Sequence, residues 1–440
     1  MDKGFWNSLL GKRGFLDSVV RRAVEINADS SRKIVFADTT DVILKAASLV
    51  KKNRIAHPLI LGDSQKLESS FRRLGLSNLD EENVIDYLLP ENKDKLDSYV
   101  NEYLEMRKKD GKPVSGQDAL QRMQMPHYYA AMMVHKGLAH GFISGATSAT
   151  KPYHPVFEII KLAPGVNKTS GVFLMAPPKG DEVYFFADCV MNISPNSEQL
   201  AEIAMLTAKT ASSFGLEPRV AMLSFSTRDS AKHESIERVK LATAMVKRKY
   251  PDMMVDGEIQ VDSALVPEVM KRKCPDSPLK GRANVLIFPD LNAGNIGYKL
   301  VERLGHYEAV GPFLQGTRKA ANDLSRGCSA EDVMYVAAVT VLQSKAYEVH
   351  DEDAQGKVIE PEVTPVYSRK AGSEEQKGSS GPGAGKEGKE GNGGNGVASK
   401  PDYLFKPSDD PLDRLPSNVR KIIEDGMNGR SGKKPGEKPD

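Results

Sequence analysis

The sequence predicts a protein of the α/β class, because helical and strand-like patterns alternate from the start of the chain. Apolar residues recur at helical spacing over Phe15–Ile26 and again over Asp41–Lys51. Short apolar runs typical of buried strands occupy Lys33–Ala37 and Pro58–Leu61. A strand, a helix and a second strand in this order indicate a parallel sheet that is covered by helices.

Size and composition narrow the class further. A length of 440 residues predicts two or three domains. The 61 Lys and Arg residues nearly balance the 59 Asp and Glu residues, so the net charge of +2 gives no electrostatic footprint for nucleic acid. No apolar run is long enough for a membrane span, and no secretory signal is present. We therefore expect a cytoplasmic protein that binds neither nucleic acid nor membrane.

Cysteine and histidine usage gives no sign of a metal centre or a disulfide framework. The three cysteines, Cys189, Cys274 and Cys328, are far apart and form no CxxC pair, which fits a reducing compartment. The eight histidines are scattered, without an HExxH spacing. We expect no metal and no cofactor.

The remaining elements continue the α/β pattern. A hairpin is expected where two strand-like runs flank a Pro-containing turn, and the helix after it should begin near Ser194 or Asn196 and end before Gly215. The expected helices are Leu96–Arg107, His127–Lys136, Val156–Lys161, Ser197–Phe214, Ser235–Lys249, a helix through Leu304, and Val333–Gln343. The expected strands are one starting at Gly141, then Val172–Met175, Val183–Ala187, Val220–Phe225, Val255–Asp262 and Asn284–Phe288.

One stretch, Gly311–Asp332, combines the chemistry of an anion site. It starts with a Gly-Pro pair and is expected to be a loop that ends on a buried helix. Ser329 and Asp332 have the spacing of a capping box, which places this loop at the positive end of that helix. Arg326 offers planar donors that match a phosphate, and Ser325 offers a hydroxyl. This combination suggests transfer chemistry on a phosphorylated or phosphate-accepting substrate.

Structural roles for the same residues stay open. Asp332 is either a general base or purely a capping residue, and the helix N-terminus stabilises its charged form, which weakens it as a base. Arg326 is either an anion ligand or one partner of a structural ion pair. Ser325 has no histidine nearby in sequence to activate it, so a hydrogen-bonding role fits its hydroxyl better than a nucleophilic one.

Other segments carry alternatives of the same kind. The hydroxyls of Ser226 and Thr227 follow a buried strand and suit a small anion. The basic cluster after Arg107 is either a solvated helix end or a clamp for a nucleotide phosphate. The acidic residues of the strand at 255–262 lie either on a solvated face, which the pattern favours, or around Mg²⁺.

The two ends of the chain differ from the rest. Residues 1–13 are a leader that is either a docking helix or a frayed end. Residues 369–440 are rich in Gly, Lys, Glu and Ser and are expected to be disordered. Within them, 412–427 has near-helical spacing and is either a short docking helix for a partner or part of the disordered tail.

Several motifs together resemble the phosphate acetyltransferase family, also called the phosphotransacetylases. They cover roughly residues 15–343 in the expected order. The matching runs are SGATSA at 144–149, AMLSFSTRDSAK at 221–232, DGEIQVDSALVP at 256–267, ANVLIFPDLNAGNIGYK at 283–299 and NDLSRGCSAEDV at 322–333.

The resemblance implies a fold of two three-layer α/β/α domains with a cleft between them, in an isocitrate/isopropylmalate-dehydrogenase-like layout. Domain I would comprise 14–162 and 311–345, and domain II would comprise 163–310. It also implies a homodimer that needs no cofactor besides its substrate CoA.

The reaction that the resemblance implies is the reversible conversion of acetyl-CoA and phosphate to acetyl phosphate and CoA in a ternary complex. Asp332 would take the proton of the CoA thiol in the reverse direction, Arg326 would hold phosphate, and Ser325 would stabilise the oxyanion or the leaving phosphate. The implied substrate-binding residues are Arg107, Ser144, Gly145, His154, Ser226, Thr227, Asn292, Gln315 and Gly316.

The chain departs from the family pattern at three places. His154-Pro155 stands where the family usually has Arg-Pro, so one cation near the pocket is lost, with His154 or Lys151 as a partial replacement. The charge of a histidine, unlike that of an arginine, varies near neutral pH. The loop at 36–41 lacks the usual acidic-Arg pattern, and the stretch at 317–320 lacks a common proline and gains Arg318. These changes bear on substrate affinity and acyl specificity more than on the class of reaction.

Four functions follow from these patterns. The first is a phosphate acetyltransferase, and the second is the same enzyme with a longer acyl group such as propionyl or butyryl. The third is a non-catalytic acyl-CoA-sensing module, against which the retention of Ser325, Arg326 and Asp332 argues. The fourth, a metal-dependent decarboxylating dehydrogenase, lacks the arrangement of aspartates that it requires.

Overall fold

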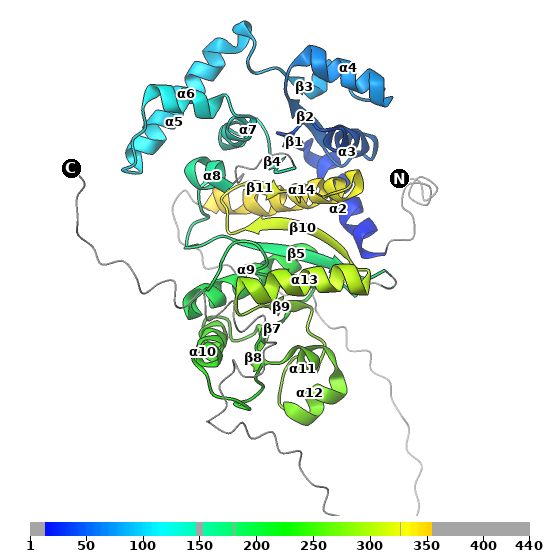
Figure 1. The fold of residues 1–440 in the computed structure, drawn as a ribbon, viewed down its shortest axis with the longest axis vertical. Coiled ribbons are helices and arrows are strands. Elements are labelled where there is room, and N and C mark those ends of the chain that lie inside the picture. The colour runs from blue at the N-terminus through cyan, green and yellow to red at the C-terminus, as the bar shows by residue number, and fades with distance from the viewer. Residues whose placement is uncertain (1–13, 147–152, 179, 181, 326, 354–440) are drawn as a thin grey trace, which may run out of the picture. The chain divides into compact units, whose positions relative to one another are not determined.

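The computed structural model describes residues 14–146, 153–178, 180, 182–325 and 327–353. The leader at 1–13, the tail at 369–440 with its segment 412–427, and Arg326 lie outside the described residues. The predicted α/β class is confirmed: the described chain forms two sheets with helices on their faces (Figure 1).

The first sheet is parallel throughout and has the strand order β11-β4-β1-β2-β3. Its strands are buried on both faces, as parallel sheets require. Ile34 and Phe36 face one layer of helices, whereas Val35 and Ala37 face the other. The strands are β1 (Lys33–Phe36), β2 (His57–Leu61), β3 (Val84–Ile85), β4 (Gly141–Ser144) and β11 (Ala320–Asp323).

Two helix layers enclose this sheet, which gives three layers. One layer holds α2 (Phe15–Ser30), α3 (Asp41–Lys52), α4 (Ser64–Leu74) and α14 (Ala330–Asp353). The other holds α5 (Lys93–Lys109), α6 (Gly116–Met123), α7 (Pro126–His135) and the π-helical turn η3 (Val156–Ile160). Short elements complete it, namely η1 (Glu81–Asn83), η2 (Pro90–Asn92) and α8 (Tyr153–Pro155).

The second sheet is mixed and has the order β10-β5-β6-β9-β7-β8. The predicted hairpin is confirmed, since β5 and β6 are antiparallel neighbours. The strands are β5 (Ser170–Ala176), β6 (Tyr184–Ala187), β7 (Arg219–Leu223), β8 (Met254–Ile259), β9 (Val285–Ile287) and β10 (Glu308–Gln315). The helices are α9 (Ser197–Ser213), α10 (Glu234–Lys249), α11 (Val261–Leu265), α12 (Pro267–Lys273) and α13 (Leu291–Gly305).

The predicted helix start at Asn196 is confirmed in atomic detail. The Asn196 side chain accepts from Gln199 N at 2.9 Å, and the Gln199 side chain accepts from Asn196 N at 3.0 Å, so the two form a capping box. This cap begins α9, one of the helices that cover the second sheet.

The predicted loop from Gly311 to Asp332 is wrong over much of its length, because it contains strands β10 and β11. Gly311-Pro312 lies at a register shift within β10, which is an edge strand, and an edge or a bulge is where a sheet tolerates proline. Phe313, Leu314 and Gln315 pair with β5 of the second sheet, and Gly311 and Pro312 lie at the register shift before them.

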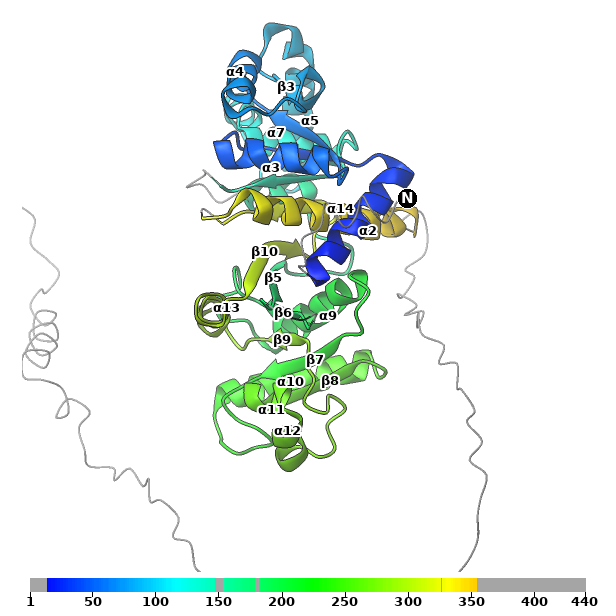
Figure 2. The ribbon, with the colours of Figure 1, turned by 90° about the vertical axis from the view of Figure 1, so that its right-hand side faces the viewer.

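Helix α14 confirms the prediction of a buried closing helix. Its residues from Val333 to Leu342 are buried, and it packs against α2 and α3 (Figure 2). One apolar cluster includes α14 together with strands of both sheets. None of the helices in the described part of the chain combines the length and apolar character that crossing a bilayer requires.

The contact between β4 and α14 leaves no room for a side chain at Gly141. A Cβ there would lie 2.5 Å from Thr340 Cγ2 and 3.0 Å from Ala320 O. We expect Gly141→Ala to destabilise the fold by about 1–3 kcal/mol through overpacking, measured by chemical denaturation.

The matched double variant Gly141→Ala with Thr340→Ser removes the crowding methyl group but keeps the hydroxyl that donates to Val336 O. It should recover part of the loss. A double variant that is less stable than Gly141→Ala alone would contradict this explanation.

Candidate active site

The carboxyl ends of the central strands bring three polar segments together at one edge of the first sheet, as parallel strands do. Asp38 follows β1, Ser144 ends β4, and Asp323 ends β11. Asp323 pairs in register with Ser144, and Leu324 N donates to Ser144 O at 2.9 Å. These strand ends define the candidate site.

The turn at Gly145 lies between two of these carboxylates. Asp38 Oδ2 accepts hydrogen bonds from Gly145 N at 2.8 Å and from Ala146 N at 3.2 Å. Gly145 has φ +121°, and a Cβ there would lie 1.9 Å from Asp323 Oδ1. Only glycine fits, because the backbone passes directly against the Asp323 carboxylate.

Asp323 also holds Tyr153, whose hydroxyl donates to Asp323 Oδ2 at 2.7 Å. Burial raises the pKa of Asp323 to about 6, and the nearby negative charge of Asp38 adds to the effect. The hydrogen bonds from Tyr153 and Leu324 N oppose this shift, since they favour the charged form. Burial, followed by the charge of Asp323, raises the pKa of the Tyr153 hydroxyl.

Two histidines, His127 and His154, lie near each other, and His127 is also near Asp38. His127 is buried, and its burial lowers the pKa of the imidazole, with a further lowering from His154 and an opposing effect of Asp38. His154 itself is exposed. The site therefore presents a buried imidazole that is neutral at physiological pH and an exposed imidazole near it.

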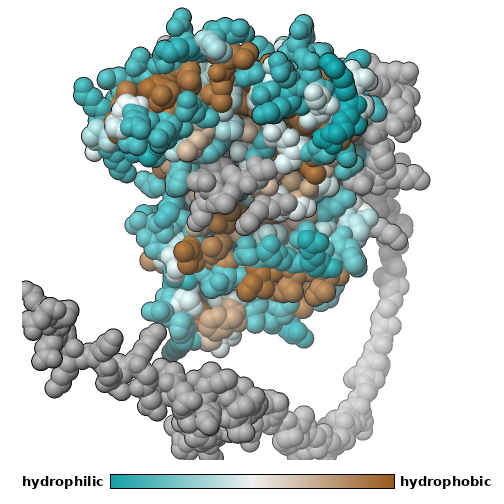
Figure 3. Space-filling view, turned by 45° about the horizontal axis from the view of Figure 1, so that its top comes forward, coloured by the Kyte–Doolittle hydropathy of each residue, from teal (hydrophilic) through white to brown (hydrophobic). Residues whose placement is uncertain are grey.

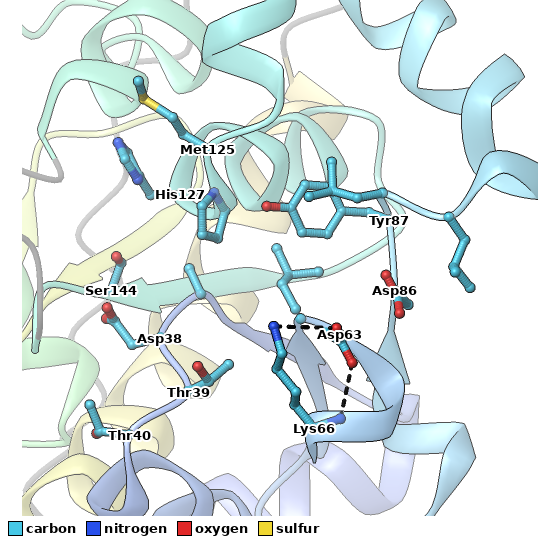
Figure 4. A pocket seen from close by; sticks show the side chains of 16 residues that line it. Asp38, Thr39, Thr40, Asp63, Lys66, Asp86, Tyr87, Met125, His127 and Ser144 are labelled. Atoms are coloured by element: carbon cyan, nitrogen blue, oxygen red, sulfur yellow. Dashed lines mark hydrogen bonds and ion pairs between the residues drawn. The ribbon is translucent and has the colours of Figure 1, made fainter. Parts of the chain in front are cut away.

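A cavity of about 870 Å³ opens beside these strand ends. Figure 4 shows Asp38, Ser144 and His127 on one side of it and Asp63, Lys66 and Asp86 on the other. Its size suits a ligand of several hundred daltons.

The carboxylates of this cavity hold helix α4 in place. Asp63 caps α4 by accepting from Lys66 N at 3.0 Å, and Asp86 accepts from Ser64 N at 2.8 Å. Among the described residues that line the cavity, Lys66 is the one Lys or Arg, against three aspartates. The rim is apolar, with Leu88 and Met125 exposed by 53% and 41%.

The predicted capping box at the start of α14 is confirmed. Ser329 N donates to Asp332 Oδ2 at 2.8 Å, and Asp332 N donates to Ser329 Oγ at 3.1 Å. Asp332 also lines a second cavity of about 390 Å³ beside the end of α13. One oxygen of the Asp332 carboxylate thus accepts a hydrogen bond from Ser329 N, and the residue also borders the second cavity.

Cys328 connects this helix start to the strand ends. Burial raises the pKa of the Cys328 thiol, and the charges of Asp332, Asp38 and Asp323 raise it further. Ser325, on the same loop, is exposed, and its hydroxyl accepts from Gly327 N at 3.4 Å.

Arg107 does not line the large cavity. Its side chain, 11% exposed, lies near two carboxylates, at 3.5 Å from Asp110 Oδ2 and 3.9 Å from Glu158 Oε1. Glu158 also pairs with Arg122 at 2.8 Å. A phosphate bound by Arg107 would have to compete with these carboxylates.

The predicted binding residues of the second sheet have hydrogen-bond partners within their own sheet and its helices. Ser226 Oγ donates to Glu258 Oε1 at 3.1 Å, and Thr227 Oγ1 donates to Gln260 Oε1 at 3.2 Å, and both residues are buried. Gln315 is 2% exposed, and its amide donates to Ser170 and Thr207 hydroxyls at 2.8 Å. Gly316 follows it, and Asn292 is exposed in the first turn of α13.

The expectation of a solvated acidic face at 255–262 is wrong for its two central carboxylates. Asp256 is fully buried and accepts from Arg228 at 2.9 Å and from Lys247 at 3.0 Å. Glu258 is 3% exposed and accepts from Asp229 N at 2.8 Å. Asp256 can be buried because cations from neighbouring segments pair with it, whereas Glu258 accepts from the Ser226 hydroxyl and a backbone N–H. The expected strand also ends earlier, at Ile259, and Val261–Leu265 forms helix α11.

Sequence reasoning missed Asp38, His127 and Asp323 and did not single out Tyr153. A signal for two of them was present, since Asp38 comes just after a buried strand and Asp323 precedes Ser325. Ligands bind at the carboxyl ends of strands in α/β sheets, and this principle singled out Ser226 and Thr227 in the sequence. It did not single out Asp323, because the composition around β11 predicts a loop and not a strand.

Comparison with known proteins agrees with this fold. A model of the family described as "Phosphate acetyl/butaryl transferase" matches residues 15–341. The phosphate acetyltransferase of Bacillus subtilis is 46% identical over 71% of this chain and 94% of the relative. That of Thermoanaerobacterium thermosaccharolyticum is 44% identical over 74% of this chain and 100% of the relative.

Solved structures give the same result. The EutD phosphotransacetylase from Staphylococcus aureus is 40% identical, with a TM-score of 0.67 over 75% of this chain and 98% of that one. A phosphotransacetylase from Streptococcus pyogenes is 39% identical, with a TM-score of 0.69 over 77% of this chain and 100% of that one. The protein is an α/β acyltransferase. It belongs to the phosphate acetyl/butaryl transferase family.

The raised pKa of Asp323 predicts that the stability of the fold depends on pH, because ionising this carboxyl in the folded state is unfavourable. The folded state holds the proton of this carboxyl up to about pH 6, whereas the unfolded state releases it near the ordinary pKa of 3.8. Stability is thus lost as pH rises through this window and stays lost above it. Because Asn carries no charge, Asp323→Asn should gain stability over wild type between pH 5 and pH 8, by about 1–3 kcal/mol.

Melting temperatures of both proteins at several pH values test this. Asp262→Asn is the matched control of opposite sign, because a hydrogen bond from Lys273 lowers the pKa of Asp262. It should lose stability relative to wild type at pH 8. A loss in Asp323→Asn at pH 8 would show that the carboxylate is a net stabilising group.

Proposed function

We propose that this protein is a phosphate acetyltransferase, which transfers the acetyl group reversibly between CoA and inorganic phosphate in a ternary complex. The observation that carries the proposal is the identity of 46% and 44% to relatives named for this activity, across 94% and 100% of their length. The arrangement of Ser325, Asp332 and the Gly145 turn supports it, since it combines a hydroxyl, a carboxylate and a close backbone approach.

In the proposed reaction Asp332 accepts the proton when the CoA thiol attacks acetyl phosphate, and it returns that proton in the opposite direction. The cavity next to Asp332 leaves room for a thiol to approach. The hydrogen bond from Ser329 N keeps the carboxylate in one orientation. Ser325 donates to the oxyanion or the phosphate, and Arg326 supplies the charge that holds phosphate.

The large cavity is suited to the pantetheine arm of CoA rather than to its phosphates. The three aspartates and one lysine of the described lining disfavour polyanions, whereas the apolar rim at Leu88 and Met125 and the hydroxyls of Thr39 and Thr40 match an arm built of methylenes and amides. Holding both substrates against the strand ends would supply much of the rate by proximity. The proposed reaction requires no metal or other cofactor.

The first test is thiol release from acetyl-CoA, with and without phosphate, by wild type and Arg326→Ala. Wild type should release thiol only when phosphate is present. Loss of one charged donor at the reacting group should lower the rate about 10²- to 10³-fold. Propionyl-CoA and butyryl-CoA in the same assay define the acyl specificity.

Arg248→Ala is the matched control, because Arg248 is exposed in the last turn of α10 and distant in sequence from every proposed site residue. It should keep full activity. Phosphate-independent release, or an Arg326→Ala variant as active as the control, would contradict the proposed function.

We further propose a cytoplasmic homodimer. Helix α13 supports the dimer, because Ile296, Leu300 and Leu304 are 57%, 52% and 76% exposed and, four residues apart, share one face. Hydrophobic side chains gather in patches on the face drawn in Figure 3. Exposed apolar stripes of this kind mark interaction surfaces.

Leu300→Asp should therefore convert the dimer to a monomer, because a charge would be buried without a partner. Sedimentation velocity measures the change. Lys299→Asp, on the neighbouring exposed position, is the control and should remain dimeric. A wild-type protein that sediments as a monomer would exclude the dimer, and an unaltered Leu300→Asp dimer would exclude this helix as its interface.

A further inference from the structure

Asp323 lies where two segments of the candidate site are joined. It is the last residue of β11, and the chain continues from it through Leu324 to Ser325. The register of β11 on β4 sets Asp323 opposite Ser144. Any displacement of Asp323 would thus move the Ser325 loop relative to the end of β4.

The two carboxylate oxygens of Asp323 contact two different residues. Oδ2 accepts the Tyr153 hydroxyl at 2.7 Å. Oδ1 packs against Gly145 so closely that a Cβ there would lie 1.9 Å away. One side chain therefore links the turn after β4, the start of α8 and the strand that leads to Ser325.

The same contacts are costly in free energy. Asp323 is partly buried and lies near a second carboxylate, Asp38, and both effects raise the pKa of its carboxyl. Among the described residues, the groups that face this pair are Tyr153 from α8, Cys328 from the loop before α14, and His127 from α7 with His154 beside it. A partly buried carboxylate with a raised pKa is unfavourable for the fold, and such groups cluster at functional sites.

We propose that Asp323 is a positioning residue for acyl transfer. It holds the Gly145 turn and Tyr153 against the Ser325 loop, so that the turn and the loop contact the same substrate. This role rests on the proposed function. Asp323 acts through Tyr153 and the Gly145 backbone.

Tyr153→Phe is the gentlest test, because it removes only the hydroxyl that Asp323 accepts. We expect kcat for phosphate-dependent thiol release to fall about 10- to 100-fold, the effect of a small misplacement of reacting groups. KM for acetyl-CoA should change less than kcat. Tyr250→Phe, at the end of α10, is the matched control and should match wild type.

A double-mutant cycle with Asp323→Asn separates positioning from an independent effect. Asn keeps the shape and an acceptor oxygen, but it loses the charge. If Asp323 works through Tyr153, the double variant should be about as slow as the slower single variant rather than slower by the product of both. Multiplying effects would overturn the proposed route through Tyr153.

Hydrogen exchange of the peptide that covers residues 141–146 provides a readout that needs no activity. Gly145 N and Ala146 N are held by Asp38 in the intact site. Loss of the hydroxyl that Asp323 accepts should speed their exchange in Tyr153→Phe, while peptides of the second sheet stay unchanged. Unchanged exchange at 141–146 would overturn the proposal even if the wild-type enzyme were inactive.

The two proposals fail in different ways. A wild type without phosphate-dependent release contradicts the function, whereas exchange at 141–146 still decides the positioning role. An active wild type with Tyr153→Phe and Asp323→Asn as fast as Tyr250→Phe contradicts the positioning role alone.

Discussion

The close approach of the β4 turn to the Asp323 carboxylate is the constraint on which the candidate site depends. It requires glycine at position 145, because a side chain there would occupy the position of the Asp323 oxygen. The same turn also brings Asp38 close to Asp323, because Asp38 accepts hydrogen bonds from the backbone N–H groups of Gly145 and Ala146. The resulting site has two carboxylates near each other, Asp38 buried and Asp323 partly buried, an arrangement that costs stability and is typical of sites that perform chemistry.

The neighbouring strands and helix α14 hold β4, and thus the turn after it, in place. β4 is a central strand between β1 and β11, and α14 packs over it so tightly that Gly141 cannot carry a side chain. The same helix begins with the Ser329–Asp332 capping box. Consequently the helix that completes the core also places Asp332, so that packing and chemistry are set by one element.

Much of the fold could be predicted from the sequence because local patterns and tertiary packing agree. Helices such as α3 and α9 have caps and apolar spacing that specify them without their neighbours. β10 and β11 could not be predicted this way. Gly311-Pro312 is a loop signal by composition, and only the position of β10 at the edge of the second sheet makes it compatible with a strand.

The site was predicted in part for the same reason. The capping box was visible because its residues are close in sequence, whereas the contact of Tyr153 with Asp323 joins residues far apart along the chain. The burial of Asp256 was missed because its partners Arg228 and Lys247 lie on other segments. Contacts between distant residues decide whether a charged group is solvated, paired or poised for function, and no local pattern reports them.

The central claim is that an acetyl group moves between CoA and phosphate at the edge of the first sheet. The most direct measurement is phosphorus NMR of the purified protein with acetyl-CoA and inorganic phosphate. We expect acetyl phosphate to accumulate in equal amounts with free CoA, and the reaction to run backwards when acetyl phosphate and CoA are supplied. Release of CoA without acetyl phosphate would indicate hydrolysis and would contradict the claim, as would no reaction in either direction.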